Sequence, residues 1–594
     1  IIKNYYKDIR ELRRRLTFKG VEDKLIKIQD KLHEYVFLRN SKNTFSSKHL
    51  MNSLQEIKLI IIKDHQSLYL NLVDSLINKV KLFGSHFATM DIRQDSRVHN
   101  NVFNEIVKTS IKNKLDLFPN NYFELIESEQ IQCLSEVKGC IELSNFSDKL
   151  VLNTLNTIKA IKKIQTTNGE KAANRYIISN NKTAMNVMQL FAMLKLVAFD
   201  KELTIDICPL FETIEDLENA SDVMKSLYTN PTYLAHLQKR KLKQNIMLGF
   251  SDGTKDGGYL MANWAIYKAK QMLTSISRKY NVDVIFFDGR GGPPARGGGK
   301  THKFYASLGP SIESKEVQLT VQGQTISSNF GTLESSKYNI EQLMSSGILN
   351  KLNETDLTIS KDCYETMDNL SKISYDAYVN FKNHPKFLSY LEHMSTLKYY
   401  SKTNVGSRPS KRNSDDKLVF SDLRAIPFVG SWSQLKQNVP GFFGVGHAIK
   451  YYDDLGELSK VKKLYRESNF FKTLIENSMM SLSKSFLNLT KYMSKDKVYG
   501  DFWNIIFNEY NTTLEMLYKL TGSRKLMKEE PAGKLSIEAR ESIVLPLLTI
   551  QQHALKKLQE LKKDPIKNKD EIIIYDKIVT RSLFGNINAS RNSA

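Results

Sequence analysis

Seven short apolar runs, each ending in polar or charged residues, constrain the fold of this chain more than any other feature of its sequence. The runs are FATMDIRQ (87–94), RYIISN (175–180), LTIDICPLFET (203–213), NIMLGFSD (245–252), VDVIFFDGR (282–290), VQLTVQG (317–323) and LRAIPFVGSW (423–432). A helical pattern follows each run, and strands that alternate with helices favour a parallel sheet. The pattern therefore predicts an α/β fold with a (β/α)8 barrel, of which seven of the eight strands are present.

Helical patterns fill most of the remaining chain and divide it into three regions. Residues 1–80 carry apolar positions at spacings of three and four, which predicts helices. Residues 81–450 would hold the barrel with inserted helices and catalytic loops, and residues 451–594 would form a C-terminal helical region. Within the second region, the polar stretch SKTNVGSRPSKRNSDDK (401–417) is typical of a mobile loop.

The basic net charge invites a comparison with nucleic-acid-binding proteins. Lysine and arginine exceed aspartate and glutamate by 86 − 64 = 22. A nucleic-acid-binding face would gather these cations, whereas here they are dispersed among acidic residues along many helical patterns. The charge fits an anionic small substrate equally well, and we do not expect a nucleic-acid partner.

Cysteine content and hydropathy indicate the compartment. The four cysteines lack the spacing of metal ligands, and so few in so long a chain suggest the reducing cytoplasm. No apolar stretch reaches the length that crosses a membrane. The chain begins IIKNYYKDIRELRRRL, without methionine and already in helical periodicity, so we expect that an N-terminal part is missing.

The stretch FFDGRGGPPARGGGKTHK (286–303) predicts an anion-binding loop. Glycines let backbone N–H groups approach an oxyanion closely, and Arg290 and Arg296 can add charged hydrogen bonds. The ending GGGKT is similar to a P-loop, but Pro294 stands where that motif needs a glycine. A flexible, solvated loop remains the alternative.

Carboxylates at two successive strand ends suggest a metal site. Asp252, Lys255 and Asp256 follow one predicted strand in GFSDGTKDGG (249–258), and Glu212 closes the preceding one. A hard cation such as Mg²⁺ needs only one or two protein carboxylates. Helix caps or solvated turns are the alternative for each residue alone.

Two arginines also lie on predicted strands. Arg93 follows the first strand, at the position where barrels bind substrates; its alternative is an ion pair with Asp91 or Asp95. Arg424 lies within the last predicted strand, where a buried arginine is costly unless it is paired.

Several motifs together resemble the phosphoenolpyruvate carboxylase family. In chain order they are DIRQDS, PLFET, GFSDGTKDGG, GRGGPPARGGG, VGSRPSKR, LRAIPFVGSW and SRNSA, and the similarity runs from about residue 83 to the end. The resemblance implies an α/β barrel among many extra helices and a homotetramer built as a dimer of dimers. It also implies that phosphoenolpyruvate and bicarbonate give oxaloacetate and phosphate through carboxyphosphate and an enolate, with Mg²⁺ or Mn²⁺.

The resemblance assigns roles to the residues at matching positions. Glu212 and Asp252 match the metal ligands. Catalytic roles fall to Lys255, Arg296, Arg290 and Arg93, and substrate binding to Arg424, Lys436, Arg408, Gly291, Gly292, Gly297 and Gly298. The glycine loop would close on phosphoenolpyruvate and protect carboxyphosphate from water.

Three departures from the family pattern lead to further expectations. The family's His-Pro-Thr motif is absent, and NHPKF at His384 lies elsewhere, so we expect this chain alone to be inactive. Asp288 replaces the histidine before the glycine loop, where a carboxylate would repel bicarbonate unless it is protonated. Lys436 replaces an arginine and offers a point charge instead of a planar fork.

The resemblance also implies inhibition by aspartate or malate, which many family members show. Arg296, Lys484, Arg540 and Asn592 match the inhibitor site, and three cations with an amide suit a dicarboxylate. Solvated helix charge remains the alternative for Lys484 and Arg540. For the whole chain, the alternative to an enzyme is a degenerate relative that senses dicarboxylates or phosphoenolpyruvate, for which Asp288 is the best support.

Overall fold

The computed structural model describes residues 1–38, 45–200, 202–352, 359–402, 419–420 and 423–590. By their internal contacts these residues form two compact units. The first unit comprises residues 1–178 and 185–208, and the second comprises residues 179–184 and 209–594. The expected division at residues 80 and 450 stays a prediction.

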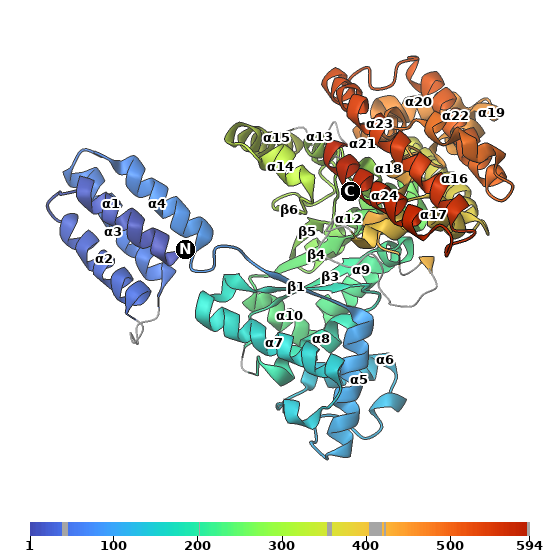
Figure 1. Cartoon of the computed structure of the whole chain (residues 1–594). Helices are drawn as coiled ribbons and strands as arrows, with labels where there is room; N and C mark the ends of the chain where they lie inside the picture. The colour runs from blue at the N-terminus through green and yellow to red at the C-terminus, as the bar shows by residue number, and fades with distance from the viewer. Residues whose placement is uncertain (39–44, 201, 353–358, 403–418, 421–422, 591–594) are drawn as a thin grey trace. The chain divides into compact units, whose positions relative to one another are not determined.

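The first four helices pack into a bundle with a hydrophobic core of its own (Figure 1). They are α1 (Ile2–Arg15), α2 (Glu22–Phe37), α3 (Ser47–Asp64) and α4 (Leu70–Phe83). Along α1, Tyr5, Ile9 and Leu12 are buried, which is the spacing of three and four that a single helix face requires. The helical prediction for residues 1–80 is confirmed.

The rest of the first unit leads into the sheet. Its elements are β1 (Asp91–Asp95), α5 (Ser96–Lys112), η1 (Tyr122–Glu124), α6 (Glu127–Glu136), η2 (Leu143–Asn145), α7 (Lys149–Asn168), η3 (Glu170–Ala172), β2 (Arg175–Ser179), α8 (Ala184–Val197) and the start of β3 (Asp206–Phe211). Within this unit, buried His99 of α5 contacts the hydroxyl of Tyr176 at 3.1 Å. Burial lowers the pKa of His99 to about 4, so the imidazole is neutral in the fold.

Six strands form one sheet in chain order, β1-β2-β3-β4-β5-β6. The later strands are β4 (Lys243–Leu248), β5 (Asp283–Asp288) and β6 (Val317–Leu319). Strand β3 pairs in parallel with β4, β4 with β5, and β5 with β6, with Leu248 opposite both Phe211 and Asp288. The α/β class and six of the seven predicted strands are thus confirmed.

The seventh predicted strand is wrong, because residues 425–432 of LRAIPFVGSW lie in helix α18 (Ala425–Gln434). An apolar run without periodicity is compatible with a buried helix as well as with a strand. Pro427 lies in the first turn, where a missing N–H costs no helical hydrogen bond. A Cβ at Gly430 would lie 2.1 Å from the hydroxyl of Tyr400, so this close helix contact needs glycine.

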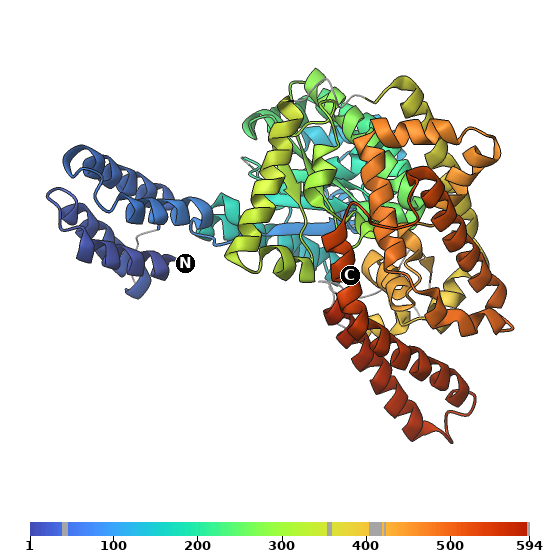
Figure 2. The same ribbon diagram turned by 90° about the horizontal axis from the view of Figure 1, so that it is seen from above.

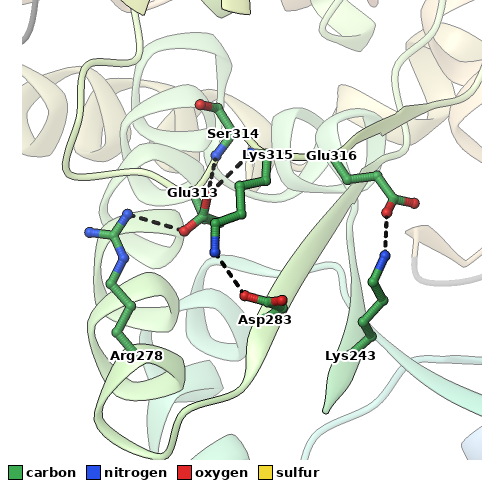
Figure 3. Close-up of polar contacts among 7 residues, drawn as sticks. All are labelled: Lys243, Arg278, Asp283, Glu313, Ser314, Lys315 and Glu316. Atoms are coloured by element: carbon green, nitrogen blue, oxygen red, sulfur yellow. Dashed lines mark hydrogen bonds and ion pairs between the residues drawn. The ribbon is translucent and has the colours of Figure 1, made fainter. Parts of the chain in front are cut away.

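Ion pairs fasten the amino-terminal edge of the sheet in the second unit (Figure 3). Lys243 of β4 pairs with Glu316 at 2.9 Å, and Lys315 pairs with Asp283 of β5 at 3.0 Å. The carboxylate of Glu313 accepts hydrogen bonds from the backbone N–H groups of Ser314 and Lys315. Such exposed pairs contribute little stability each, but they join neighbouring strand starts at the edge opposite the carboxyl ends.

The remaining helices belong to the second unit. They are α9 (Ile214–Thr229), α10 (Pro231–Lys239), α11 (Phe250–Gly257), α12 (Tyr259–Lys279), η4 (Pro294–Arg296), α13 (Thr301–Ala306), α14 (Gln324–Phe330), α15 (Leu333–Leu352), α16 (Lys361–Lys382), α17 (Phe387–Met394), η5 (Leu397–Lys402), η7 (Val439–Gly441), α19 (Val445–Asp454), α20 (Leu458–Glu467), α21 (Asn469–Ser483), η8 (Leu487–Lys495), α22 (Gly500–Thr521), α23 (Pro531–Leu561) and α24 (Lys569–Ser590). Among the described helices, none has both the length and the apolar composition that a membrane span requires.

Aromatic side chains dominate the core among these helices. Phe381 of α16, Trp432 of α18 and Phe502 of α22 are all buried in one cluster. Helices α23 and α24 lie side by side in both views and bury a smaller cluster with Tyr399 and Tyr400 (Figures 1 and 2). These packed helices bring α18, α21 and α23 to the loop that follows β5.

Candidate active site

Two carboxylates lie at neighbouring carboxyl ends of the sheet, as the sequence predicted. Glu212 directly follows β3, and Asp252 lies in the first turn of α11, directly after β4. Because Phe211 pairs with Leu248, Glu212 and Gly249 occupy adjacent positions at the same edge. A Cβ at Gly249 would lie 3.2 Å from the Cα and Cγ of Glu212, so glycine leaves room for the glutamate side chain there.

Several hydrogen bonds hold Glu212 in place. Its Oε2 accepts a 2.6 Å bond from the backbone N–H of Asn180, and its own N–H donates to Asp216 at 3.3 Å. The N–H of Ile214 donates to Asp256 of α11 at 3.1 Å. Asp256 thus accepts the N–H of the first residue of α9, a helix whose N-cap residue is Thr213, and it joins the segments that follow β3 and β4.

The donor set of Glu212 and Asp252 fits a hard divalent cation. Mg²⁺ and Mn²⁺ prefer oxygen ligands, and Mg²⁺ takes one or two carboxylates, with water or substrate oxygens at its other positions. Among the described residues, no cluster of three or more histidine, cysteine, aspartate or glutamate side chains could hold a metal ion.

Lys255 contacts the backbone directly before Arg424, although this segment lies far along the chain from it. The buried Nζ of Lys255 donates to the carbonyl of Leu423 at 2.8 Å and to that of Phe420 at 3.3 Å. It also lies 5.0 Å from the centre of the Phe420 ring. Arg424 follows Leu423 directly and is the N-cap residue of α18, so Lys255 fixes the backbone that presents this arginine.

The glycine loop after β5 is compact and hydrogen-bonded, not a solvated loop. The N–H of Gly291 donates to the carbonyl of Arg296 at 2.7 Å, and that of Gly298 donates to Pro293 at 2.9 Å. A Cβ at Gly298 would lie 1.9 Å from the carbonyl oxygen of Gly292. Gly297 has φ +74°, the left-handed region that favours glycine. The glycines are therefore required by the close approach of backbone to backbone.

The two loop arginines are buried and keep hydrogen-bonding capacity. The guanidinium of Arg290 lies 4.3 Å from the centre of the Phe304 ring, and its Nε donates to the carbonyl of Gly297. Arg296 donates from Nε to Ser251 at 3.1 Å and from Nη2 to Gln322. The Nη1 atoms of both arginines are buried without a hydrogen-bond partner among the described residues. Buried donors without partners are costly, so these two point to an anionic ligand.

The charge of Arg296 is tuned by its surroundings. Burial lowers the pKa of its guanidinium to about 10, although the nearby carboxylate of Asp252 acts in the opposite direction. Arg296 therefore stays charged at neutral pH and links the glycine loop electrostatically to one predicted metal ligand. An oxyanion between them would meet an arginine on one side and a metal on the other.

A cavity of about 250 Å³ adjoins the loop on the side of β6. It is lined by residues of the loop, of the end of β6, and of helices α13 to α15, including Arg290, Gly291, Gly292, Gly298, Lys300, Thr301, Thr320, Gln322 and Asn339. Its size and the cations Arg290 and Lys300 in its lining suit a small anionic substrate.

A group of cations lies against residues 293–295 of the loop. Lys436, Lys484, Arg540 and Glu541 line one small cavity together with Pro293, Pro294 and Ala295 of the loop. Burial and, to a smaller extent, the neighbouring cations Lys436 and Arg540 lower the pKa of Lys484 to about 8, while the carboxylate of Glu541 acts in the opposite direction. The structure thus brings the two predicted effector residues Lys484 and Arg540 together, and places Lys436 with them.

Three predicted site residues lie in the first unit or outside the described residues. Arg93 lies on β1, in the first unit. On the same strand Asp91 pairs with Arg175 at 2.7 Å, and Asp95 pairs with Arg97 at 2.9 Å. Arg408 and Asn592 lie outside the described residues, as do residues 403–417 of the predicted mobile loop. The roles of these residues stay predictions.

Sequence reasoning missed several residues that shape the site. Ser251 and Gln322, the partners of Arg296, stand inside quoted motifs, where a polar residue beside a functional one could have been noticed. Lys270 and Tyr305, which contact Asp288, offered no such signal. Lys270 belongs to a helical pattern in which a lysine normally indicates a solvated face.

Comparisons with known proteins agree on one family. A model of the family described as phosphoenolpyruvate carboxylase matches residues 3–589. A phosphoenolpyruvate carboxylase of Nitrosomonas eutropha is 30% identical over 572 residues, which cover 91% of this chain and 60% of that protein. One from Prochlorococcus marinus strain MIT 9515 is 29% identical over 568 residues, which cover 92% of this chain and 55% of that protein. The chain therefore spans less than two thirds of the length of these relatives.

Proposed function

This chain belongs to the phosphoenolpyruvate carboxylase family, and from that membership we propose that the protein expressed from its whole gene carries out the carboxylation of phosphoenolpyruvate by bicarbonate, which gives oxaloacetate and phosphate. The observation that carries the proposal is the pair of buried Nη1 donors on Arg290 and Arg296, which have no hydrogen-bond partner among the described residues; Arg296 also lies near the carboxylate of Asp252. A substrate with a phosphate and a carboxylate group matches such donors.

The chain's own residues would supply positioning and charge. Arg290 and Arg296 would bind the phosphate oxygens, and Arg424, held in place through Lys255, would bind a second anionic group. When bound to Glu212 and Asp252, Mg²⁺ or Mn²⁺ would supply Lewis-acid stabilisation of developing negative charge. Phosphoryl transfer needs little more than such alignment and neutralisation. The buried loop would also exclude water from carboxyphosphate.

The proposal extends to the barrel, to an inhibitor site and to the assembly of the protein. Strand order that equals chain order is what a (β/α)8 barrel produces, which supports an incomplete barrel of this kind. The cavity with Lys484 and Arg540 would bind aspartate or malate as inhibitors. We further propose a cytoplasmic homotetramer. The alternative of a catalytically degenerate sensor is not favoured, because relatives across the chain carry the name of the enzyme.

The test is oxaloacetate formation by the protein expressed from its whole gene, followed by coupled NADH oxidation. The rate should require phosphoenolpyruvate, bicarbonate and Mg²⁺ or Mn²⁺. Asp252→Asn should lower kcat by at least about 10²-fold, since it removes one carboxylate of the metal pair. Asp283→Asn, at the opposite edge of the sheet, removes an exposed carboxylate and should leave the rate unchanged. Phosphate release without bicarbonate, or full activity of Asp252→Asn, would reject the proposal.

A further inference from the structure

Asp288 occupies an unexpected place for an acidic residue, directly before an anion-binding loop. It ends β5 and is fully buried. Its Oδ2 accepts a 2.7 Å bond from the Nζ of Lys270 and a 2.5 Å bond from the hydroxyl of Tyr305. The expected repulsion between this carboxylate and an incoming anion is therefore balanced inside the protein by the ammonium group of Lys270.

Lys270 is held in this position by aromatic rings. It projects from α12, its side chain is 1% exposed, and its Nζ lies 5.1 Å from the centre of the Phe286 ring and 5.6 Å from that of Tyr305. Burial lowers the pKa of Lys270, and the carboxylate of Asp288 acts in the opposite direction. A lysine so deeply buried keeps its charge only beside a carboxylate. The two residues are therefore a matched pair.

The pair is connected to Arg290 in two ways. The backbone N–H of Arg290 donates to the carbonyl of Asp288 at 2.9 Å, so the position of Asp288 fixes the backbone of Arg290. Tyr305, whose hydroxyl bonds to Asp288, lies with its ring centre 5.7 Å from the guanidinium. Phe304, the neighbour of Tyr305 on α13, lies at 4.3 Å from the same guanidinium. A shift of Asp288 would thus move both the backbone and the aromatic surface that orient Arg290.

We propose that Asp288, Lys270 and Tyr305 form a positioning set that fixes the guanidinium of Arg290 for an anionic oxygen of the substrate, while presenting no net negative charge to it. The proposal rests on the proposed function for the identity of the substrate, but its geometry concerns any phosphate-bearing ligand of the loop. None of the three residues is assigned a contact with the reacting atoms. They act through Arg290.

The test compares variants that remove one charge of the pair with a variant that removes both, each in the protein expressed from its whole gene. Asp288→Asn leaves Lys270 without a counter-charge, and Lys270→Met does the same to Asp288. Each should weaken the binding of inorganic phosphate, measured by calorimetry, by at least about tenfold and raise KM for phosphoenolpyruvate more than it lowers kcat. The double variant removes both charges and keeps an acceptor for Tyr305, so it should bind phosphate within about threefold of the wild type.

A control variant and a milder test variant separate an effect on the position of Arg290 from an effect on stability. Removal of the exposed pair Lys243 and Glu316 from the same sheet should change neither phosphate binding nor KM. Tyr305→Phe keeps the ring but loses the bond to Asp288, and we expect it to weaken phosphate binding about threefold or more. If the single variants do not fold, this variant decides the question.

The outcomes also distinguish the two proposals. If the single variants unfold at lower temperature but bind phosphate as the wild type does, the three residues are structural and the positioning set is wrong. It is equally wrong if the wild type does not bind phosphate at all. If phosphate binding follows the expected pattern but no oxaloacetate forms, the positioning set stands and the proposed function fails.

Discussion

Lys436 and Glu541 form an ion pair, with 2.5 Å between Nζ and Oε1, inside the cavity that also contains Lys484 and Arg540. The side chain of Lys436 is 6% exposed, so the pair is largely withdrawn from water. The cavity thus already holds one carboxylate of the protein. A dicarboxylate that enters would have to compete with Glu541 for the same cations, which predicts weaker binding than three free cations would give.

Replacing this internal carboxylate should strengthen inhibitor binding. We expect Glu541→Gln to bind aspartate or malate about tenfold more tightly, because one repulsive charge is removed and Lys436 becomes available. Calorimetry at neutral pH measures the change directly. Glu538→Gln, on the same helix but exposed, is the matched control and should bind like the wild type. Equal or weaker binding by Glu541→Gln would show that Glu541 does not compete for the cations.

The lowered pKa of Lys484 predicts proton uptake when a dicarboxylate binds. With a pKa of about 8, this lysine is partly neutral at pH 8, and a bound anion would raise its pKa and draw in a proton. Calorimetry at pH 8 in buffers of different ionisation enthalpy should show an uptake of up to about half a proton. Affinity should fall between pH 7 and pH 9. In Lys484→Arg, whose charge is permanent, both effects should disappear; proton uptake that persists in this variant must come from another group.

The glycine loop should not tolerate a side chain at Gly298. Since a Cβ there would lie 1.9 Å from the backbone oxygen of Gly292, Gly298→Ala must open the loop and displace Arg290 and Arg296. We expect phosphate binding to weaken by at least about tenfold. Gly347 lies within α15, and none of the described residues has an atom within 4 Å of such a Cβ, its own helix backbone and chain neighbours aside. Gly347→Ala should therefore stabilise the protein by about 0.5–1 kcal/mol without changing phosphate binding, and unchanged binding by Gly298→Ala would refute the role of the loop.

The sequence predicted the parts of the fold that depend on local pattern. Six strands, the helices of residues 1–80 and the neighbouring placement of Glu212 and Asp252 follow from periodicity and from residues at strand ends. Helix α18 did not follow, because an apolar run without periodicity is ambiguous. Its helical state depends on tertiary contacts, such as that between Gly430 and Tyr400, which no local window contains.

The long-range pairs of the site were beyond prediction for a related reason. Lys436 meets Glu541, 105 residues further along the chain. Lys270 lies on α12, and its partner Asp288 is the last residue of the following strand β5. A lysine in a helical pattern reads as a solvated charge unless its partner is known, so only the three-dimensional arrangement shows that these two are buried.

Glu509 gives a pH-dependent prediction away from the loop. It lies on α22, is 9% exposed, and accepts hydrogen bonds from the backbone N–H groups of Gly444 at 2.9 Å and His447 at 3.3 Å, at the start of α19. Burial nevertheless raises its pKa to about 7, against an ordinary value of 4.5. The folded pKa lies above the unfolded one, so the stability contributed by the protonated form is complete below pH 4.5 and is lost as the pH rises through 7.

Glu509→Gln, which cannot ionise, should remove this loss. By linkage, the advantage of the variant over the wild type in free energy of unfolding should grow by up to about 3 kcal/mol between pH 4.5 and pH 8. Urea unfolding at several pH values measures the difference, and Glu515→Gln, exposed on the same helix, should show no such trend. A difference that shrinks with rising pH would mean that the amides of α19 stabilise the ionised carboxylate more than burial destabilises it. Glu509 would then be a charged cap of that helix, and its contribution to stability would be present above a lowered pKa and lost in acid.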